Sequence, residues 1–235
     1  MTREFPRLGV IGTNTALDAP VAAASAHDLA GGGGFHREPG IVQSTARGER
    51  VMDPLTRLFM ERIIFLGSEV NDVVANSIVS QLLYLESEDD RSPITLYVNS
   101  PGGSISAGTA ITDTMEYIAP PVHTIGFGMC ISMGAWILAA GEKGHRSCLP
   151  GTCIMIHQPL SGVGGQATDI EIHAKQILLT REIMYRKLAT YTGQPFDKVA
   201  RDCERDNFLR AEEAMSYGLI DAIMPSRKGM RMPQQ

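Results

Sequence analysis

The sequence predicts an α/β fold built around a largely parallel sheet. Short runs rich in aliphatic residues alternate with segments whose apolar residues recur every three or four positions. The runs are expected to be strands and start roughly thirty residues apart, the length of one strand with its following helix; they are Ile63 to Gly67, Ile94 to Ser100, Val122 to Phe127 and Cys153 to His157. Strands regularly followed by helices pair in parallel. Because these runs are almost wholly apolar, both sheet faces are expected to be covered.

Two helices are predicted from the spacing of their apolar residues. The first has Val74, Ile78, Leu82 and Leu85 on one face. The second runs from Thr168 to Thr192, about 35 Å at 1.5 Å per residue. A capping box of Thr168 and Glu171 is expected at its start, and Gly193 with Pro195 at its end.

The longer helix is apolar on two sides. One stripe is Ile170, Ala174, Ile177, Met184, Leu188 and Tyr191, and the other is Ile172, Leu179 and Ile183. Such a helix is expected to project from its own subunit and to bury its second face on a neighbour. The alternative is a central core helix.

Composition predicts one folded domain with a leader and a tail. The chain has 235 residues, of which 43% are hydrophobic, enough for one core. Residues 1–40 are rich in Ala and Gly and are expected to form a flexible leader or propeptide. Residues 41–228 are expected to form the folded domain, and residues 229–235 a C-terminal tail.

Charge and targeting signals narrow the class of protein. The formal net charge of −5 comes from mixed acidic and basic residues without a Lys/Arg stripe, so nucleic acid is not an expected partner. Residues 122–140 lack Lys, Arg, Asp and Glu, but glycines divide them, so a buried strand and helix are expected instead of a membrane span. The first residues resemble neither a secretory signal nor a transit peptide. We therefore expect a soluble, cytoplasmic protein.

The cysteines do not predict a metal site. The chain has four, Cys130, Cys148, Cys153 and Cys203, with no C-x-x-C pair, as is typical of a reducing compartment. Cys148, Cys153 and His157 are spaced loosely like metal ligands, but a structural zinc site needs a fourth ligand. No metal and no cofactor are expected.

Ser132 lies where a predicted strand meets a predicted helix, Met133 to Ala140. Such a turn exposes the hydroxyl beside the unpaired N–H groups of a helix N-terminus, which stabilise developing negative charge. This is a setting for a nucleophile with half of an oxyanion hole. The alternative is a simple N-cap serine.

Two further groups lie at corresponding strand ends. The turn Pro101-Gly102-Gly103 lets a backbone N–H point at a substrate carbonyl, unless it is a plain turn. His157 ends another strand, and a neighbouring imidazole can take the proton of a serine hydroxyl. Because the carboxyl ends of parallel strands meet at one edge of a sheet, both are expected to lie near Ser132.

A serine triad also needs a carboxylate that orients the imidazole. The candidates are Asp202, Glu204, Asp206, Glu212 and Glu213, and spacing alone does not choose among them.

Four segments resemble blocks of the proteolytic subunits of Clp proteases, in that family's order and spacing. They are SPGGSISAG at 100–108, GMCISMGA around Ser132, MIHQPL around His157 and ERDNFLRAEEAMSYGLIDAI at 204–223. The resemblance implies that Ser132 is the nucleophile, His157 the general base and then acid, and Asp206 the orienting carboxylate. It also implies an oxyanion hole formed by the backbone N–H groups of Gly103 and Met133.

The same resemblance implies a fold and an assembly. The fold would be a crotonase-like spiral of ββα units whose handle helix lies between two stacked rings of seven subunits, of one type or mixed with a paralogue. Gly162 to Gln166 would lie beside the bound peptide. An AAA+ unfoldase of the ClpX, ClpA or ClpC type would use the ATP and deliver unfolded polypeptides, docking near Tyr97 and Tyr117.

The implied function is that of a serine endopeptidase subunit of an ATP-dependent Clp protease, which degrades unfolded proteins to short peptides in a ring chamber. One departure is that the family usually has small residues just before the nucleophile, whereas this chain has Cys130 and Ile131. If Ile131 is not accommodated, it would cost about 1–3 kcal/mol. Two alternatives stay open: a catalytically weak or inactive structural ring subunit, and a crotonase-type enzyme acting on acyl-CoA.

Overall fold

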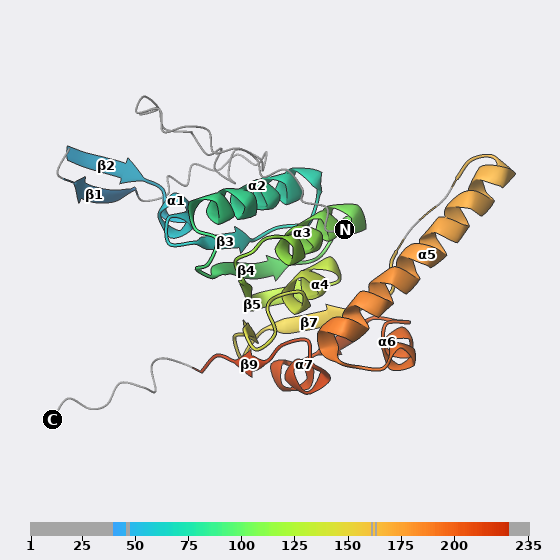
Figure 1. The fold of residues 1–235 in the computed structure, drawn as a ribbon. Helices are drawn as coiled ribbons and strands as arrows, with labels where there is room; N and C mark the ends of the chain where they lie inside the picture. The colour runs from blue at the N-terminus through green and yellow to red at the C-terminus, as the bar shows by residue number, and fades with distance from the viewer. Residues whose placement is uncertain (1–39, 46–47, 161, 163, 226–235) are drawn as a thin grey trace, which may run out of the picture. The chain divides into compact units, whose positions relative to one another are not determined.

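A computed structural model describes residues 40–45, 48–160, 162 and 164–225 (Figure 1), and the elements below belong to that part of the chain. Its strands are β1 (Ile41–Thr45), β2 (Gly48–Met52), β3 (Ile63–Leu66), β4 (Ile94–Ser100), β5 (Val122–Ile131), β6 (Arg146–Cys148), β7 (Cys153–Ile156), β8 (Asn207–Leu209) and β9 (Ala222–Ile223). Its helices are α1 (Pro54–Phe59), α2 (Asp72–Glu88), α3 (Ile105–Tyr117), α4 (Met133–Ala139), α5 (Ala167–Thr192), α6 (Phe196–Asp202) and α7 (Ala211–Tyr217).

A mostly parallel sheet lies at the centre of the fold. Its strand order is β3-β4-β5-β6-β9, with β7 beside the end of β5 and β8 beside β7. Every pair in this sheet is parallel except β7 with β8, and β1 with β2 forms a separate antiparallel hairpin. The predicted α/β class with a mostly parallel sheet is confirmed. The spiral of ββα units stays a prediction.

One face of the sheet is buried and the other is only partly covered. Burial along β4 alternates residue by residue, and α2, α3 and α4 pack over the buried face (Figure 1). The other face carries an aromatic cluster of Phe65, Tyr97 and Phe127, in which Phe65 and Tyr97 stack with ring centroids 5.0 Å apart. All three side chains are half-buried. The expectation that both faces are covered is therefore wrong for the described residues.

β5 extends beyond the predicted end at Phe127 and bends on the way. Its first half pairs with β6 and its last three residues pair with β7. At the bend, the register against β4 shifts and Gly128 adopts a φ of +63°. Asn99 Oδ1 accepts a hydrogen bond from the Met129 N–H at 3.1 Å and so holds the bulge. The bulge brings the end of β5, and with it Ser132, alongside β7.

The start of α5 differs from its prediction and the end agrees with it. The helix begins at Ala167, with Gln166 as a cap that makes no side-chain capping bond. The predicted capping box of Thr168 and Glu171 is wrong, since the Glu171 carboxylate instead pairs with Lys175 at 2.7 Å. Gly193, with a φ of +72°, ends the helix as predicted.

Only the C-terminal part of α5 packs against the rest of the described fold. Its buried residues are Met184, Tyr185, Leu188 and Thr192. The rest of the helix projects away from the sheet in Figure 1, and five of its large apolar side chains are 41–58% exposed. They are Ile170, Ile172, Leu178, Leu179 and Ile183. The alternative of a central core helix is wrong, because only the C-terminal end of α5 is buried, where it packs against α4 and α6.

Several expectations concern residues outside the described part of the chain. They concern residues 1–39 of the leader expected at 1–40, the tail expected at 229–235, and residue 163 within the stretch expected beside the peptide. Residues 122–140 form β5 and α4, as predicted. Among the described residues, no helix is both long enough and apolar enough to cross a membrane.

Candidate active site

Ser132 occupies a strained turn between β5 and α4. Its φ of +55° and ψ of −123° place a non-glycine residue in a sparsely populated region, at a cost of about 1–3 kcal/mol. The side chain makes no capping hydrogen bond, so the alternative of a simple N-cap serine is wrong. Instead the backbone N–H of Ser132 donates to the Met155 carbonyl at 2.9 Å, which ties the turn to β7. A strained strand-to-helix turn of this kind exposes a nucleophilic hydroxyl.

A glycine loop packs directly against that turn. A Cβ on Gly102 would lie 2.6 Å from the Ser132 Cβ and 2.7 Å from the Ile131 carbonyl oxygen, so no larger residue fits. Val70 holds the loop: its N–H donates to the Gly102 carbonyl and its carbonyl accepts from the Ser104 N–H, both at 2.8 Å.

The two predicted oxyanion donors, the N–H groups of Gly103 and Met133, are not used by the hydrogen bonds that hold the glycine loop and α4. The bonds to Val70 use the groups on either side of Gly103, so the Gly103 N–H faces away from Val70. Met133 opens α4, and its N–H has no carbonyl partner within the helix. The glycine loop reaches the same helix end, because a Cβ on Gly102 would lie 3.0 Å from the Met133 nitrogen.

His157 joins the serine to one of the candidate carboxylates. Its Nε2 lies 2.8 Å from Ser132 Oγ, and its Nδ1 lies 3.2 Å from Asp206 Oδ1. The antiparallel register of β7 and β8 pairs Ile156 with Asn207, which places the next residue outward on each strand, His157 and Asp206, opposite each other. The His157 side chain is 13% exposed and that of Asp206 is 63% exposed. The structure thus brings together the residues that the resemblance assigned to the triad.

The other candidate carboxylates have different surroundings. Asp202 pairs with Lys198 at 2.6 Å, and Glu213 accepts the Arg210 N–H at 2.7 Å as a cap of α7. Glu204 and Glu212 are exposed.

Sequence reasoning missed three residues that position the site. Asn99 holds the bulge in β5, and Ser100 Oγ accepts the Gly102 N–H at 3.1 Å. The Gln158 side chain donates to the Glu204 carbonyl at 2.8 Å and so holds the segment before Asp206. Asn99 and Ser100 directly precede the Pro101-Gly102-Gly103 turn, and Gln158 directly follows His157. A polar residue next to these motifs was the sequence signal that could have identified them.

Ser132 and His157 open into a cleft of about 500 Å³. Most of its lining is apolar: besides Ser132 and His157 it includes Glu69, Pro101, Gly102, Gly103, Ile105, Ile131, Met133, Trp136, Met155, Gln158, Pro159, Leu160 and Met184. A cleft of this kind can hold an extended chain by its apolar side chains while the backbone N–H groups bind its carbonyls.

The residues before the nucleophile are accommodated. Cys130 is fully buried, its thiol donates to the Val98 carbonyl at 3.2 Å, and burial raises its pKa to about 12. Ile131 pairs with Met155 and forms part of the cleft wall. Ile131 is therefore part of the surface that would meet a substrate.

Cys148, Cys153 and His157, which are spaced loosely like metal ligands, do not form a metal site in the described part of the chain. Cys148 is buried within the sheet, whereas Cys153 is exposed at the start of β7. Within the described ranges, no group of three or more His, Cys, Asp or Glu side chains is arranged to hold a metal ion.

Comparison with known families places the site within a described family. A sequence model of the Clp protease family matches residues 46–227. The matched segment covers most of the chain and contains every residue of the site described above.

Proposed function

The chain belongs to the Clp protease family, and on that premise we propose that it is a serine endopeptidase subunit acting through an acyl-enzyme at Ser132. The observation that carries this proposal is the pair of contacts made by His157, at 2.8 Å to Ser132 Oγ and 3.2 Å to Asp206 Oδ1. A hydroxyl, an imidazole and a carboxylate in this order are the parts that nucleophilic peptide hydrolysis needs.

In the first half of the reaction, Ser132 Oγ attacks the substrate carbonyl carbon while His157 Nε2 takes the hydroxyl proton. The Nδ1–H donates to Asp206, which fixes the tautomer and stabilises the imidazolium that forms. The resulting oxyanion accepts hydrogen bonds from the N–H groups of Gly103 and Met133. When the tetrahedral intermediate collapses, the C–N bond breaks and His157 gives its proton to the leaving amine.

In the second half, water replaces the amine. His157 takes a proton from the water as it attacks the acyl-enzyme, and the same two N–H groups stabilise the second oxyanion. Collapse breaks the bond to Ser132 Oγ, which recovers its proton from the imidazole. Each donor of this kind is typically worth about 10²–10³-fold in rate.

We further propose that the subunit works in a cytoplasmic ring assembly that degrades unfolded polypeptides to short peptides. The exposed apolar side chains of α5 support this, because monomeric proteins rarely leave so much apolar surface along one helix. A second ring facing the first would cover them. Two stacked rings of seven, of one subunit type or mixed with a paralogue, is the arrangement that the family implies.

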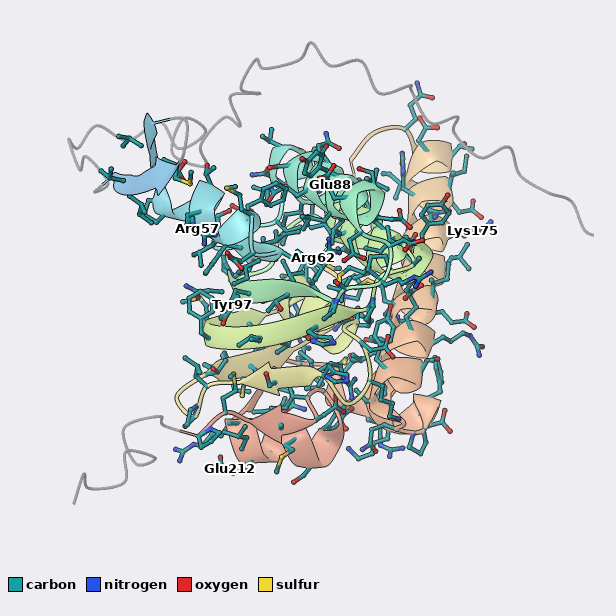
Figure 2. All side chains as sticks on the ribbon, turned by 60° about the vertical axis from the view of Figure 1, so that its left-hand side comes forward. Arg57, Arg62, Glu88, Tyr97, Lys175 and Glu212 are labelled. Atoms are coloured by element: carbon teal, nitrogen blue, oxygen red, sulfur yellow. The ribbon has the colours of Figure 1, made fainter. Side chains whose placement is uncertain are left out.

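An AAA+ unfoldase of the Clp type is the proposed partner, and ATP would be consumed there and not by this chain. Tyr97 belongs to the half-buried aromatic cluster and lies on the side of the sheet away from α5 (Figure 2), and Tyr117 is 79% exposed. Both are available for docking, although Tyr97 also packs within its own subunit. Substitution of Tyr117 by Ala should weaken stimulation by an unfoldase while leaving hydrolysis of short peptides unchanged.

Reaction with a fluorophosphonate tests the proposed activity, with Ser132→Ala as the matched control. We expect the wild-type chain to be labelled and to cleave a small blocked peptide, and the variant to do neither. An assembly that forms rings, resists labelling and cleaves nothing even with its unfoldase would instead be a structural subunit. Saturable binding of coenzyme A without labelling would favour the crotonase-type alternative.

A further inference from the structure

One side chain in the active-site cleft carries a charge that catalysis of peptide hydrolysis does not require. Glu69 is the only carboxylate among the described residues that line the cleft, and that lining includes no Lys or Arg. The Glu69 side chain is exposed, and it forms no ion pair with any described residue. The cleft therefore presents one uncompensated negative charge to a substrate.

The backbone holds this charge close to the reacting carbonyl. Val70, the next residue, is bound on both sides to the glycine loop by two hydrogen bonds of 2.8 Å. The Glu69 Cγ lies 3.0 Å from the point that a Cβ on Gly103 would occupy. Since Gly103 supplies a proposed oxyanion donor, the Glu69 side chain lies beside the proposed oxyanion site.

A negative charge at this place acts against the reaction unless something offsets it. The transition state develops an oxyanion, and a nearby carboxylate raises its energy. A cation on the substrate would both pair with the carboxylate and remove this repulsion. The effect would then appear in kcat/KM, which reports stabilisation of the transition state.

We propose that Glu69 makes the enzyme favour peptides that carry a cationic group next to the scissile bond. The inference rests on the proposed peptidase function and specifies its substrate class. The cation can be a Lys or Arg side chain or the free α-amino group of a short peptide. Because Glu69 is solvated, the preference should be roughly two- to fivefold, the range that exposed ion pairs give.

The test compares blocked fluorogenic peptides that differ at one position. Each position flanking the cleaved bond is either Lys or norleucine, and a further pair has a free or an acetylated amino terminus. The wild-type assembly should cleave the cationic member faster at one or more positions, and the ratio should fall as salt is raised. In Glu69→Gln, which keeps the side-chain shape, the ratio should fall to about one.

Glu88→Gln is the matched control, since it makes the same chemical change at the opposite end of α2, about 25 Å along the helix (Figure 2). It should keep the wild-type ratio. An unchanged ratio in Glu69→Gln, or no preference in the wild type, would overturn the inference while leaving the peptidase intact. If the wild type neither cleaves the neutral peptide nor reacts with a fluorophosphonate, the proposed function itself fails, and the inference fails with it.

Discussion

The two ends of the proposed triad are held in different ways. At the serine end, Ser132 is fixed by a backbone bond to Met155 and by the close packing of Gly102, and the whole of α4 behind it is buried. At the aspartate end, Asp206 is 63% exposed and precedes β8, an edge strand that pairs only with β7. The residues of β8 also line a hollow of about 510 Å³.

This difference indicates which end of the site is rigid and which is adjustable. The nucleophile's geometry is determined by the packed sheet and cannot change without disturbing the core. The position of Asp206 depends on a short strand and a few polar contacts, so changes in solution conditions can shift it at low cost. We expect substitutions around Ser132 to abolish nearly all activity, and substitutions around Asp206 to lower activity by smaller and varied amounts.

Substitution of Gly102 by Ala should have the largest effect. The new methyl group would meet Ser132 and Ile131 at less than 3 Å, at a backbone φ of +92°. Displacing both the nucleophile and an oxyanion donor should lower kcat/KM at least about a thousandfold. The control is Gly151→Ala, where nothing lies within 4 Å of the added methyl group. Near-normal activity in Gly102→Ala would show that the serine end is not rigid.

Asp206→Asn should come next, with kcat/KM reduced about a hundredfold. Asparagine favours the wrong imidazole tautomer, which costs about 10⁴-fold at a buried triad. The loss should be smaller here because water reaches the largely exposed side chain. Glu204→Gln removes a neighbouring exposed charge and serves as control. If kcat/KM falls by the full 10⁴-fold, both ends of the site are equally constrained. If kcat/KM does not fall, Asp206 does not belong to the triad.

Gln158→Leu should reduce kcat/KM about tenfold, the equivalent of one hydrogen bond worth roughly 1.4 kcal/mol. It removes the donor to the Glu204 carbonyl that holds the segment before Asp206. Gln81→Leu is the control, because that side chain bonds only to Ser77 within α2. Equal activity of the two variants would show that this contact does not position the aspartate.

Asp221→Asn should leave activity nearly unchanged and lower stability instead. Asp221 pairs with the buried Arg146, which also donates to the carbonyls of Ala139 and Tyr191 at the ends of α4 and α5. The guanidinium lowers the pKa of Asp221 from 3.8 to about 2. Loss of the Asp221 carboxylate should reduce the free energy of unfolding by roughly 2–3 kcal/mol at neutral pH.

The pH dependence of this loss in unfolding free energy follows from the lowered pKa of Asp221. The folded pKa lies below the unfolded one, so the carboxylate stabilises the fold above pH 3.8, and this contribution disappears as the pH falls to about 2. Unfolding by denaturant across this range should show the variant and the wild type converging at the acid end. A constant difference would mean that the pair is not the source of the stability.

The sequence predicted well the features that depend on local pattern. The strands containing Ile94 and Cys153 and the helix containing Leu188 lie within a few residues of their predicted bounds, because apolar period and helix-ending glycines are local signals. The predicted apolar face of α2 is also buried at Ile78, Leu82 and Leu85. The strand-end positions of Gly103, Ser132 and His157 followed from parallel pairing.

Features set by distant contacts could not be predicted in that way. Asp206 meets His157 through the register of an antiparallel pair, which a chain separation of 49 residues does not encode. The bulge in β5 depends on Asn99 from another strand. The hairpin of β1 and β2 was not predicted, because its sequence contains no strong turn signal. The capping box predicted at the start of α5 does not form, because Glu171 pairs with Lys175 within the helix.

The most direct test of the account is to stop turnover with acid and locate the acyl group by peptide mass spectrometry. A slowly deacylating ester substrate should leave its acyl group on the peptide that contains Ser132. The adduct should be absent in Ser132→Ala and much slower to form in His157→Ala. Product that accumulates without any acyl adduct, or an adduct on a different residue, would contradict the account.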